Sequence, residues 1–443
     1  MGRHRRTSRL PDPVERLDVE SLGHDGRGVA HPGGKAVFID GALPGETVAI
    51  DYLATHRNYD EARVRTVHEP SPHRVEPGCA HFGVCGGCSL QHLEAGEQIV
   101  AKQQVLLDNL SRIGGVIPEE VLPPLRGPVW GYRGKARLGI KDVIKKGRVL
   151  IGFREKRSAY LADLRRCEVL HPSVGARLPA IADLITGLTA RSRMPQVEVA
   201  VTDNATALVF RHLDALGEAD LDRLKTFARD QNIHVYLQPG GPDSVRPLWP
   251  EDSTLSYALP AQGIELEFRP TDFTQINSAI NRLMVERVVQ LLAPEGSHRV
   301  LDLYCGLGNF TLPLARHAAS VVGIEGDAGL VARARHNADR NGIDNATFHV
   351  ADLAASNIEA SWAGQTYDRI LLDPPRSGAA AALDLVGNIR PARVVYVSCH
   401  PGSLARDTAR LVGDLGYRLL AAGVMDMFPH TAHVESIALF EST

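Results

Sequence analysis

The sequence lacks the features of several specialised classes of protein. No apolar run in its 443 residues approaches the ~18 residues of a membrane span. The amino terminus carries arginines but no apolar segment behind them, so we expect no secretory signal. Six cysteines are too few for a disulfide framework in a chain of this length. We therefore expect a cytoplasmic protein with no membrane partner.

A strong charge of one sign is also lacking, because the net charge is only −3. The average hides a local asymmetry, since residues 125–170 contain 13 Lys and Arg against four Asp and Glu. Tyr132 and Phe153 are interleaved with these bases. A basic, partly aromatic, strand-rich surface suits a phosphate backbone and stacked bases. The alternative is a solvated face whose counter-charges lie elsewhere.

The length predicts two or three domains, because single cores stop growing below this size. Residues 10–70 contain about five short strand patterns separated by glycine-rich turns, which favours a small β-barrel of the OB type. Strands and helices alternate in the middle of the chain. The last third reads strand, glycine turn, helix, strand, helix, which predicts a doubly wound, Rossmann-like α/β domain.

The glycine turn lies in "LDLYCGLGNF", residues 301–310, directly after an apolar strand. Glu325 closes the next strand, where a carboxylate can bind both hydroxyls of a ribose. Thr311 stands where a pyrophosphate fingerprint would have its third glycine, so S-adenosylmethionine fits better than NAD. Asp352, after the third predicted strand, would reach the adenine, and Asp373, after the fourth, would face the same crevice. The alternative is a turn whose glycines are purely structural.

Asp373 opens the motif "DPPRSG", residues 373–378. Asp-Pro-Pro followed by an aromatic residue is associated with methylation of amino groups, because the ring stacks on the target base. Arg376 replaces that ring here, which argues against an exocyclic nitrogen as the methyl acceptor. The alternative is a rigid turn.

Cys399 and Glu435 are candidates for a nucleophile and a base. Carbon C5 of uracil attacks a methyl donor only after a thiolate has added to C6, and a base must then remove the C5 proton. Cys399 ends a strand just before a predicted helix capped by Ser403, which predicts a lowered thiol pKa. Strand parity places Glu435 beside apolar residues, which predicts a raised carboxyl pKa. The alternatives are a core cysteine, a surface ion pair, and Cys305 as the nucleophile.

Four other cysteines form a possible metal-ligand set. Three lie close together in "CAHFGVCGGCSLQH" and one is remote: Cys79, Cys85, Cys88 and Cys167. Three close thiolates and one distant thiolate suit a [4Fe–4S] cluster better than zinc, and unligated thiols are a third possibility. Radical S-adenosylmethionine enzymes use a C-x3-C-x2-C spacing instead, which leaves one iron open.

With these motifs, the sequence resembles the bacterial 23S rRNA (uracil-5-)-methyltransferases that carry an iron–sulfur cluster and a TRAM domain. The resemblance extends from about Val14 to the end and includes "FTQIN", "SCHPGSLARD" and "DMFPHTAHVE". It implies that Cys399 is the nucleophile, that Glu435 is the base, and that the four cysteines bind the cluster. The residues implied to hold S-adenosylmethionine are Gln275, Tyr304, Asn309, Glu325, Asp352 and Asp373.

The resemblance also implies three domains. Residues 10–70 would form the TRAM barrel, residues 71–93 and 126–265 the iron–sulfur and RNA-contacting domain, and residues 94–125 and 266–443 the methyltransferase domain. A monomer acting on a loop uridine of 23S rRNA is expected. His400 stands where the family usually has Asn. The alternatives are the same chemistry on tRNA, radical chemistry on RNA, and a non-catalytic RNA-binding protein.

Overall fold

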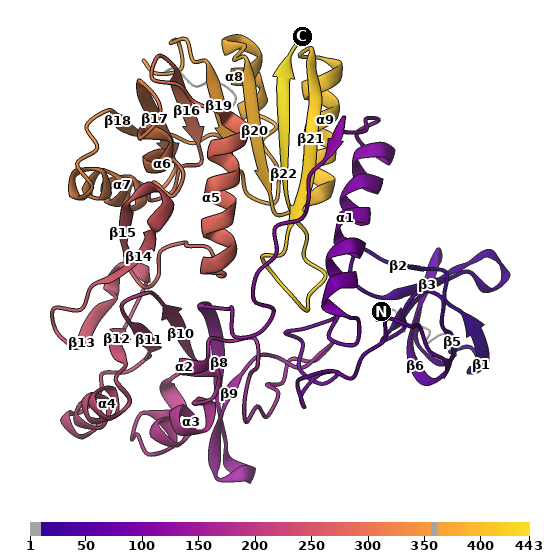
Figure 1. Ribbon diagram of the computed structural model, residues 1–443. Coiled ribbons are helices and arrows are strands. Elements are labelled where there is room, and N and C mark those ends of the chain that lie inside the picture. Colours follow the sequence, from indigo (N-terminus) through magenta and orange to yellow (C-terminus); the bar gives the residue numbers. More distant parts are fainter. Residues whose placement is uncertain (1–9, 356–360) are drawn as a thin grey trace, which may run out of the picture. The chain divides into compact units, whose positions relative to one another are not determined.

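The computed structural model describes residues 10–355 and 361–443 (Figure 1). The chain divides into two compact units. The first contains Met1–Lys102, Glu155–Arg157 and Phe428–His433, and the second contains Gln103–Arg154, Ser158–Met427 and Val434–Thr443. No helix in the described ranges is long and apolar enough to cross a membrane.

The first unit contains a six-stranded sheet in the order β1-β5-β6-β4-β3-β2. Its strands are β1 (Val14–Asp18), β2 (Ser21–Leu22), β3 (Gly28–Ala30), β4 (Ala36–Asp40), β5 (Thr47–Thr55) and β6 (Tyr59–Glu69). Alternating residues such as Val37, Ile39, Val48 and Ile50 turn inward and form its core. The predicted all-β segment is therefore confirmed, with six strands rather than five.

The cysteine-rich segment follows β6 and consists mainly of turns and isolated bridges up to helix α1 (Ala95–Arg112). Ile99, Leu106 and Leu110 recur at helical spacing along it, and all three side chains are buried. Gly115 follows the helix with φ +66°, a conformation that favours glycine and ends the helical pattern.

The second unit contains a central six-stranded sheet in the order β13-β12-β11-β10-β8-β9. Its strands are β8 (Lys135–Val143), β9 (Arg148–Gly152), β10 (Gln196–Val201), β11 (Thr206–Arg211), β12 (His234–Gln238) and β13 (Arg246–Trp249). The helices of this region are α2 (Pro172–Gly175), α3 (Leu178–Thr186) and α4 (Glu218–Gln231). A separate hairpin follows, made of β14 (Leu255–Leu259) and β15 (Ile264–Phe268).

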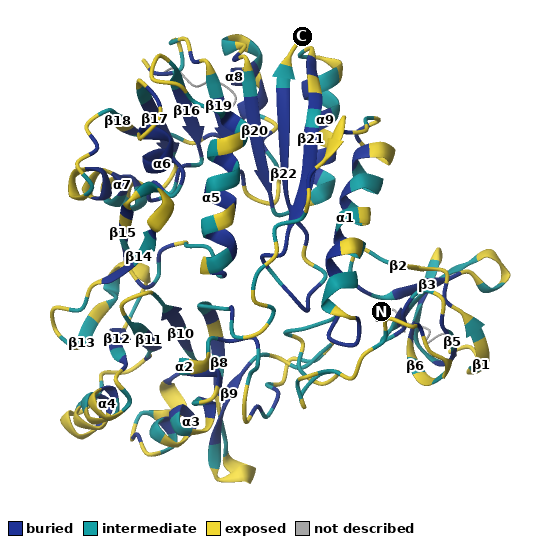
Figure 2. Cartoon of the chain, in the orientation of Figure 1, coloured by how far each residue is buried: buried dark blue, intermediate teal, exposed yellow. Residues whose placement is uncertain are grey.

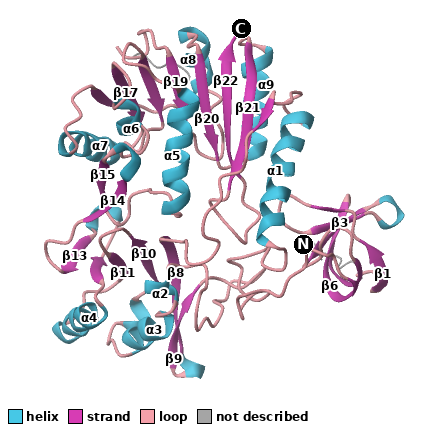
Figure 3. Ribbon diagram, viewed as in Figure 1, coloured by secondary structure: helices cyan, strands magenta, loops and turns pink. Residues whose placement is uncertain are grey.

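The second unit also contains an eight-stranded sheet in the order β18-β17-β16-β19-β20-β22-β21-β7. Its strands are β7 (Glu120–Val121), β16 (Arg299–Leu303), β17 (Ser320–Glu325), β18 (Ala346–Val350), β19 (Arg369–Leu372), β20 (Arg393–Ser398), β21 (Tyr417–Met425) and β22 (Glu435–Ser442). The helices are α5 (Ser278–Leu292), α6 (Thr311–Ala315), α7 (Ala328–Arg340), α8 (Ala382–Ile389) and α9 (Pro401–Gly413). Helix α5 packs on β19 and β20, and α9 packs on β20, β21 and β22 (Figure 3).

Strands β16 to β20 are parallel, and β22 joins them in the antiparallel sense. The central strands of this sheet are buried on both faces, as Figure 2 shows, which explains their nearly continuous apolar sequences. Parallel order brings the carboxyl ends of β16, β17, β19 and β20 to one edge of the sheet. The predicted doubly wound α/β fold is therefore confirmed.

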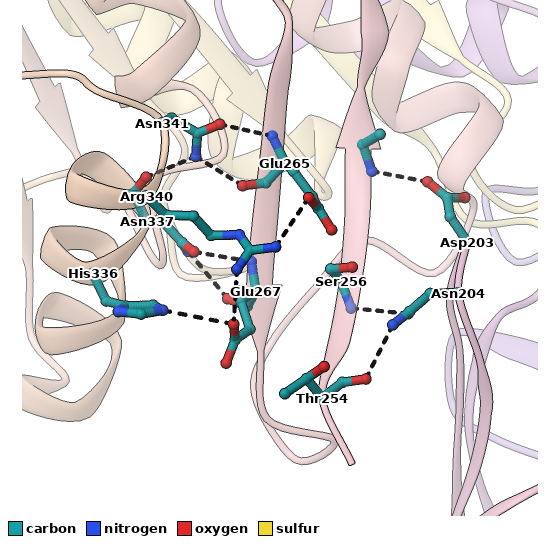
Figure 4. Close-up of polar contacts among 11 residues, drawn as sticks. Asp203, Asn204, Thr254, Ser256, Glu265, Glu267, His336, Asn337, Arg340 and Asn341 are labelled. Atoms are coloured by element: carbon teal, nitrogen blue, oxygen red, sulfur yellow. Dashed lines mark hydrogen bonds and ion pairs between the residues drawn. The ribbon is translucent and has the colours of Figure 1, made fainter. Parts of the chain in front are cut away.

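Asparagine side chains hold the β14–β15 hairpin in place (Figure 4). Asn341 bonds both the N–H and the carbonyl of Glu265, at 2.9 and 2.8 Å, and Asn337 does the same for Glu267, at 2.9 and 3.1 Å. A two-stranded hairpin is marginally stable alone, so these bonds replace those of a missing strand. Asn337 also donates to the carbonyl of Leu307, which ties the hairpin to the glycine turn.

The predicted division into three domains is finer than the two units. Residues 94–125, assigned to the methyltransferase domain by resemblance, contain β7, which pairs with β21 in the eight-stranded sheet. Helix α1 of this segment crosses the boundary between the units, which falls after Lys102. The boundaries of the three domains stay a prediction.

Candidate active site

The register of two neighbouring strands brings Cys399 and Glu435 together. Ser398 of β20 pairs with Ser436 of β22, so the next step of this antiparallel pairing sets Cys399 beside Glu435. Glu435 is only 8% exposed, and Cys399 is half-buried. The parity argument for Glu435 is weaker than expected, because β22 is buried on both faces along most of its length.

The predicted lowering of the Cys399 pKa is wrong for this structure. Burial raises the pKa of the thiol, and the negative charges of Glu435 and Asp373 raise it further. Arg376 opposes them by its charge and by a hydrogen bond to the sulfur. The expected effect of the helix start is outweighed because the thiol is removed from water and faces two carboxylates.

The start of helix α9 also differs from the prediction. The helix begins at Pro401, and its N-cap is His400 rather than Ser403. His400 Nδ1 accepts a hydrogen bond of 3.1 Å from the backbone N–H of Ser403. An Asn side chain can accept a backbone N–H in the same way.

The glycine turn forms the second part of the site. Gly306 and Gly308 have φ angles of +56° and +97°, and Tyr304 also has a positive φ of +69°. The N–H of Gly306 donates to Glu325 Oε2 at 3.1 Å, and Asp327 N–H donates to Oε1 at 3.0 Å. The predicted ribose-binding carboxylate is therefore fixed at the mouth of the turn by two backbone amides.

Acidic groups gather where the parallel strands end. Burial raises the pKa of Asp373 to about 7, and the charge of Glu325 adds to the effect. Burial also raises the pKa of Asp302 to about 7, although Thr311 Oγ1 donates a bond of 2.5 Å to its carboxyl group. Asp352 is exposed, with Oδ1 accepting from the N–H of Ala354 at 2.9 Å. This acidic edge favours a ligand that carries positive charge.

Asn309 lies in a polar network that the sequence did not reveal. Its Oδ1 accepts from the hydroxyl of Tyr257 at 2.9 Å and from Asn281 at 3.0 Å, while its Nδ2 donates to Asn281 at 3.0 Å. One N–H of Asn309 remains for a ligand. Gln275, Tyr257 and Asn281 line a neighbouring cavity of about 120 Å³.

Cys305 lies in a different environment from Cys399. It is 3% exposed, and a Cβ added at Gly323 would lie 2.9 Å from its sulfur. Burial raises its pKa, and Asp302 and Glu325 add to the shift. The side chain packs as a small core residue, so the structure does not favour Cys305 as the nucleophile.

The cysteine-rich segment is described within the first unit only. Cys79 lies close enough to Cys85 for its charge to affect the Cys85 thiol, whose pKa is raised mainly by burial. The N–H of Gly87 points at Cys85 Sγ at 3.4 Å. Among the described residues, no group of three or more His, Cys, Asp or Glu is arranged as a metal site. Cys167 belongs to the second unit.

Two functional contacts were missed by sequence reasoning. Arg376 was read only as a missing aromatic ring, whereas its guanidinium bonds to the thiol of Cys399. Asp407 of α9 is 1% exposed and accepts a 2.7 Å bond from the N–H of Ala379, directly after the "DPPRSG" motif. The charged pair "RD" in the "SCHPGSLARD" motif was the only signal that could have indicated this contact.

Seven strands of the eight-stranded sheet, numbered by their position in the domain, run in the order 3-2-1-4-5-7-6 with the seventh antiparallel. This order, with a glycine turn after the first strand and an acidic residue after the second, defines a class I methyltransferase fold. The comparisons agree with this class. The family model described as tRNA (Uracil-5-)-methyltransferase matches residues 188–443, and the TRAM domain model matches residues 13–64.

Curated relatives match along the full chain. A 23S rRNA (uracil(1939)-C(5))-methyltransferase RlmD of Methylococcus capsulatus is 54% identical over 439 residues, covering 98% of this chain and 99% of the relative. The protein of the same name from Alkalilimnicola ehrlichii is 54% identical over 442 residues, covering 100% and 99%. The chain therefore belongs to the RNA (uracil-5-)-methyltransferase family.

A solved structure supports the fold. The tRNA (uracil-54, C5)-methyltransferase of Pyrococcus abyssi, crystallised in complex with S-adenosyl-L-homocysteine, superposes with a TM-score of 0.72. It is 23% identical, and the match covers 96% of this chain and 100% of that chain.

Proposed function

We propose that this chain methylates carbon C5 of a uridine in 23S rRNA, with S-adenosylmethionine as methyl donor and a covalent adduct on Cys399. The observation that carries the proposal is that Cys399 and Glu435 directly adjoin the paired residues Ser398 of β20 and Ser436 of β22, and that the charges of Glu435 and Asp373 act on the Cys399 thiol. A nucleophile and a base are thus adjacent at the strand edge that carries the glycine turn. The full-length relatives named for 23S rRNA support the choice of RNA.

Cys399 and Glu435 act in sequence in this mechanism. The sulfur of Cys399 bonds to C6 of uracil, and the electron pair of the C5=C6 double bond makes C5 nucleophilic. S-adenosylmethionine supplies the methyl group that C5 takes up. Glu435 then removes the C5 proton, the double bond forms again, and the Cys399 thiolate leaves. Because burial raises the pKa of the thiol, a stabilising group is needed for the thiolate, and Arg376 provides it by its charge and its hydrogen bond.

The acidic edge is suited to the methyl donor. Glu325 is fixed for the ribose hydroxyls, and the negative charge of the edge favours the positively charged donor. The remaining proposed contacts are Gln275, Tyr304, the spare N–H of Asn309, and the carboxylates of Asp352 and Asp373.

We also propose a structural [4Fe–4S] cluster held by Cys79, Cys85, Cys88 and Cys167. Four thiolates are the donor set that such a cluster requires. Both ring nitrogens of His92 are buried without a hydrogen-bond partner, and its ring lies 5.4 Å from that of Phe82 in the cysteine-rich segment. The segment thus contains polar atoms that the described protein leaves unsatisfied. Iron and sulfide analysis of anaerobically purified protein tests the assignment.

The TRAM domain and the basic strands β8 and β9 are proposed to hold RNA on either side of an unstacked loop uridine. We further propose that the enzyme acts as a cytoplasmic monomer. Light scattering of the purified protein tests the oligomeric state.

A covalent trap tests the central proposal. The protein is incubated with S-adenosylmethionine and a 23S rRNA fragment carrying 5-fluorouridine, and a denaturant-stable adduct is mapped by mass spectrometry. Fluorine at C5 cannot leave as a proton, so a methylated adduct on Cys399 is expected. An adduct on Cys305 would reverse the roles of the two thiols.

The second candidate function is the same chemistry on tRNA. The family-model description and the name of the solved structural neighbour both refer to tRNA. An adduct on tRNA but not on 23S rRNA fragments would favour this substrate. No adduct on either RNA would reject the covalent mechanism.

A further inference from the structure

Two adjacent residues of helix α9 hold the turn that follows Pro375. Asp407 Oδ2 accepts hydrogen bonds from the N–H of Ala379 and from the hydroxyl of Tyr396, both at 2.7 Å. Arg406 Nη2 donates to the carbonyl of Ser377 at 2.7 Å. Residues 377–379 are therefore bonded at both ends to one short stretch of α9.

Arg406 and Asp407 are also bonded to each other. Arg406 Nε and Nη2 lie 3.1 and 3.0 Å from Asp407 Oδ1. Asp407 is 1% exposed, so its charge depends on these donors, because a buried carboxylate is costly without hydrogen bonds. Both carboxyl oxygens of Asp407 therefore accept hydrogen bonds.

Gly378 allows the turn to approach this pair. Its φ is +88°, and an added Cβ would lie 2.5 Å from Arg406 Nη2 and 2.6 Å from Asp407 Oδ2. Any side chain at this position would have to displace the turn or break its bonds to α9. The position therefore offers a way to move the turn without changing a charge.

The turn begins directly after Arg376, whose charge and hydrogen bond to the thiol of Cys399 oppose the rise of the thiol pKa. The other charged groups that face this thiol are Glu435 from β22 and Asp373 at the end of β19, and both are acidic. His400, next in the chain, uses Nδ1 to cap α9. The position of Arg376 consequently determines how strongly its positive charge lowers the pKa of the Cys399 thiol.

We propose that Arg406 and Asp407 are positioning residues, which hold residues 377–379 so that the guanidinium of Arg376 stays against the sulfur of Cys399. This role deepens the proposed function, since it rests on Cys399 as the nucleophile. Arg406 and Asp407 would thus help to activate the Cys399 thiol indirectly, through the position of Arg376.

The test is the pH dependence of Cys399 alkylation by iodoacetamide, followed in the full-length protein by mass spectrometry of the peptide that contains Cys399. Only the thiolate reacts, so the midpoint of the profile reports the thiol pKa. Arg376→Met sets the reference, with a midpoint raised by about one pH unit and a rate about tenfold lower at pH 8. Gly378→Ala and Asp407→Asn are expected to raise the midpoint by up to that amount.

The sign of the Asp407→Asn shift is decisive. Loss of a nearby negative charge would by itself lower the midpoint, whereas loss of the positioning contact raises it. Combining either substitution with Arg376→Met is expected to add no further increase, because the residues act through Arg376. Asp414→Asn, at the exposed end of the same helix, is the matched control and is expected to leave the profile unchanged.

Unchanged or lowered midpoints in both Gly378→Ala and Asp407→Asn would overturn the proposal. If Asp407→Asn does not fold, the charge-neutral Gly378→Ala decides alone. The measurement uses no RNA, so its failure is distinct from failure of the proposed function, which would appear as RNA methylation that survives Cys399→Ala.

Discussion

Two strands of the same sheet, β16 and β20, are each followed within two residues by a cysteine, and the two thiols differ in almost every other respect. Cys305 is buried beside Gly323 and Thr311, whereas Cys399 is half-buried and lies beside Glu435 and Arg376. An apolar strand followed by a thiol is thus not enough to define a nucleophile. The residues that other strands place around the sulfur decide its role.

Replacing Cys399 with Ala is expected to have the largest effect. Without the sulfur no bond to C6 forms, and methylation should fall by at least about 10⁴-fold, in the range found when other enzymes lose a nucleophile. Methyl transfer from labelled S-adenosylmethionine to 23S rRNA measures the loss. Methylation at more than a hundredth of the normal rate would contradict the assignment, and Cys305→Ala is the matched control.

Replacing Glu435 with Gln should separate the two halves of the reaction. The amide cannot take the C5 proton, so turnover should fall by about 10²–10⁴-fold, the usual contribution of a general base. A methylated adduct with ordinary, unfluorinated uridine should accumulate and survive denaturant. Gel electrophoresis under denaturing conditions detects it, and slow turnover without any adduct would place Glu435 outside this step.

Asp302, in the strand that precedes Cys305, is expected to affect the pH dependence of the free energy of unfolding rather than the rate of methylation. Asp302 has a pKa of about 7 in the folded chain, against an ordinary value of 3.8. The folded state therefore holds a proton that the unfolded state has lost between about pH 4 and pH 7. The stabilisation is complete below this window and is lost as the pH rises through it, by up to about 1.4 kcal/mol per pH unit.

Asp302→Asn should reduce the slope by about that amount, because the amide does not titrate, while Asp373, whose pKa is also raised to about 7, keeps its own share. Urea denaturation of both proteins at pH 5, 6 and 7 measures it, and equal slopes would refute the assignment. Asp368→Asn, a change of the same kind at the start of β19, is the control.

Replacing Cys305 with Ala should have the smallest effect. Loss of one buried sulfur costs about 1 kcal/mol of stability, and the methylation rate should stay within about twofold of normal. Thermal unfolding and the methyl-transfer assay measure the two quantities. If a folded Cys305→Ala variant lost most of its methylation activity, the assignment of the nucleophile to Cys399 and of a structural role to Cys305 would be contradicted.

The strand pattern could be predicted along most of the chain, because apolar runs and glycine turns are local signals. The positions of Glu325 and Asp373 at strand ends followed from the same signals, and the structure bears them out. The cap of α9 was predicted wrongly, since both His400 and Ser403 can accept a backbone N–H and the sequence does not say which residue starts the helix. The pKa of Cys399 was predicted in the wrong direction because the helix start was the only local influence in view.

The amino-acid sequence by itself determined the class of this protein. Glycine spacing, strand-end carboxylates and a strand-end thiol follow from residue types and short separations, which need no knowledge of distant contacts. Only the tertiary structure decided what surrounds that thiol. Pairing of β20 with β22 brings Glu435 to Cys399, and pairing with β19 brings Arg376, because neighbours in a sheet are set by strand order rather than by separation along the chain.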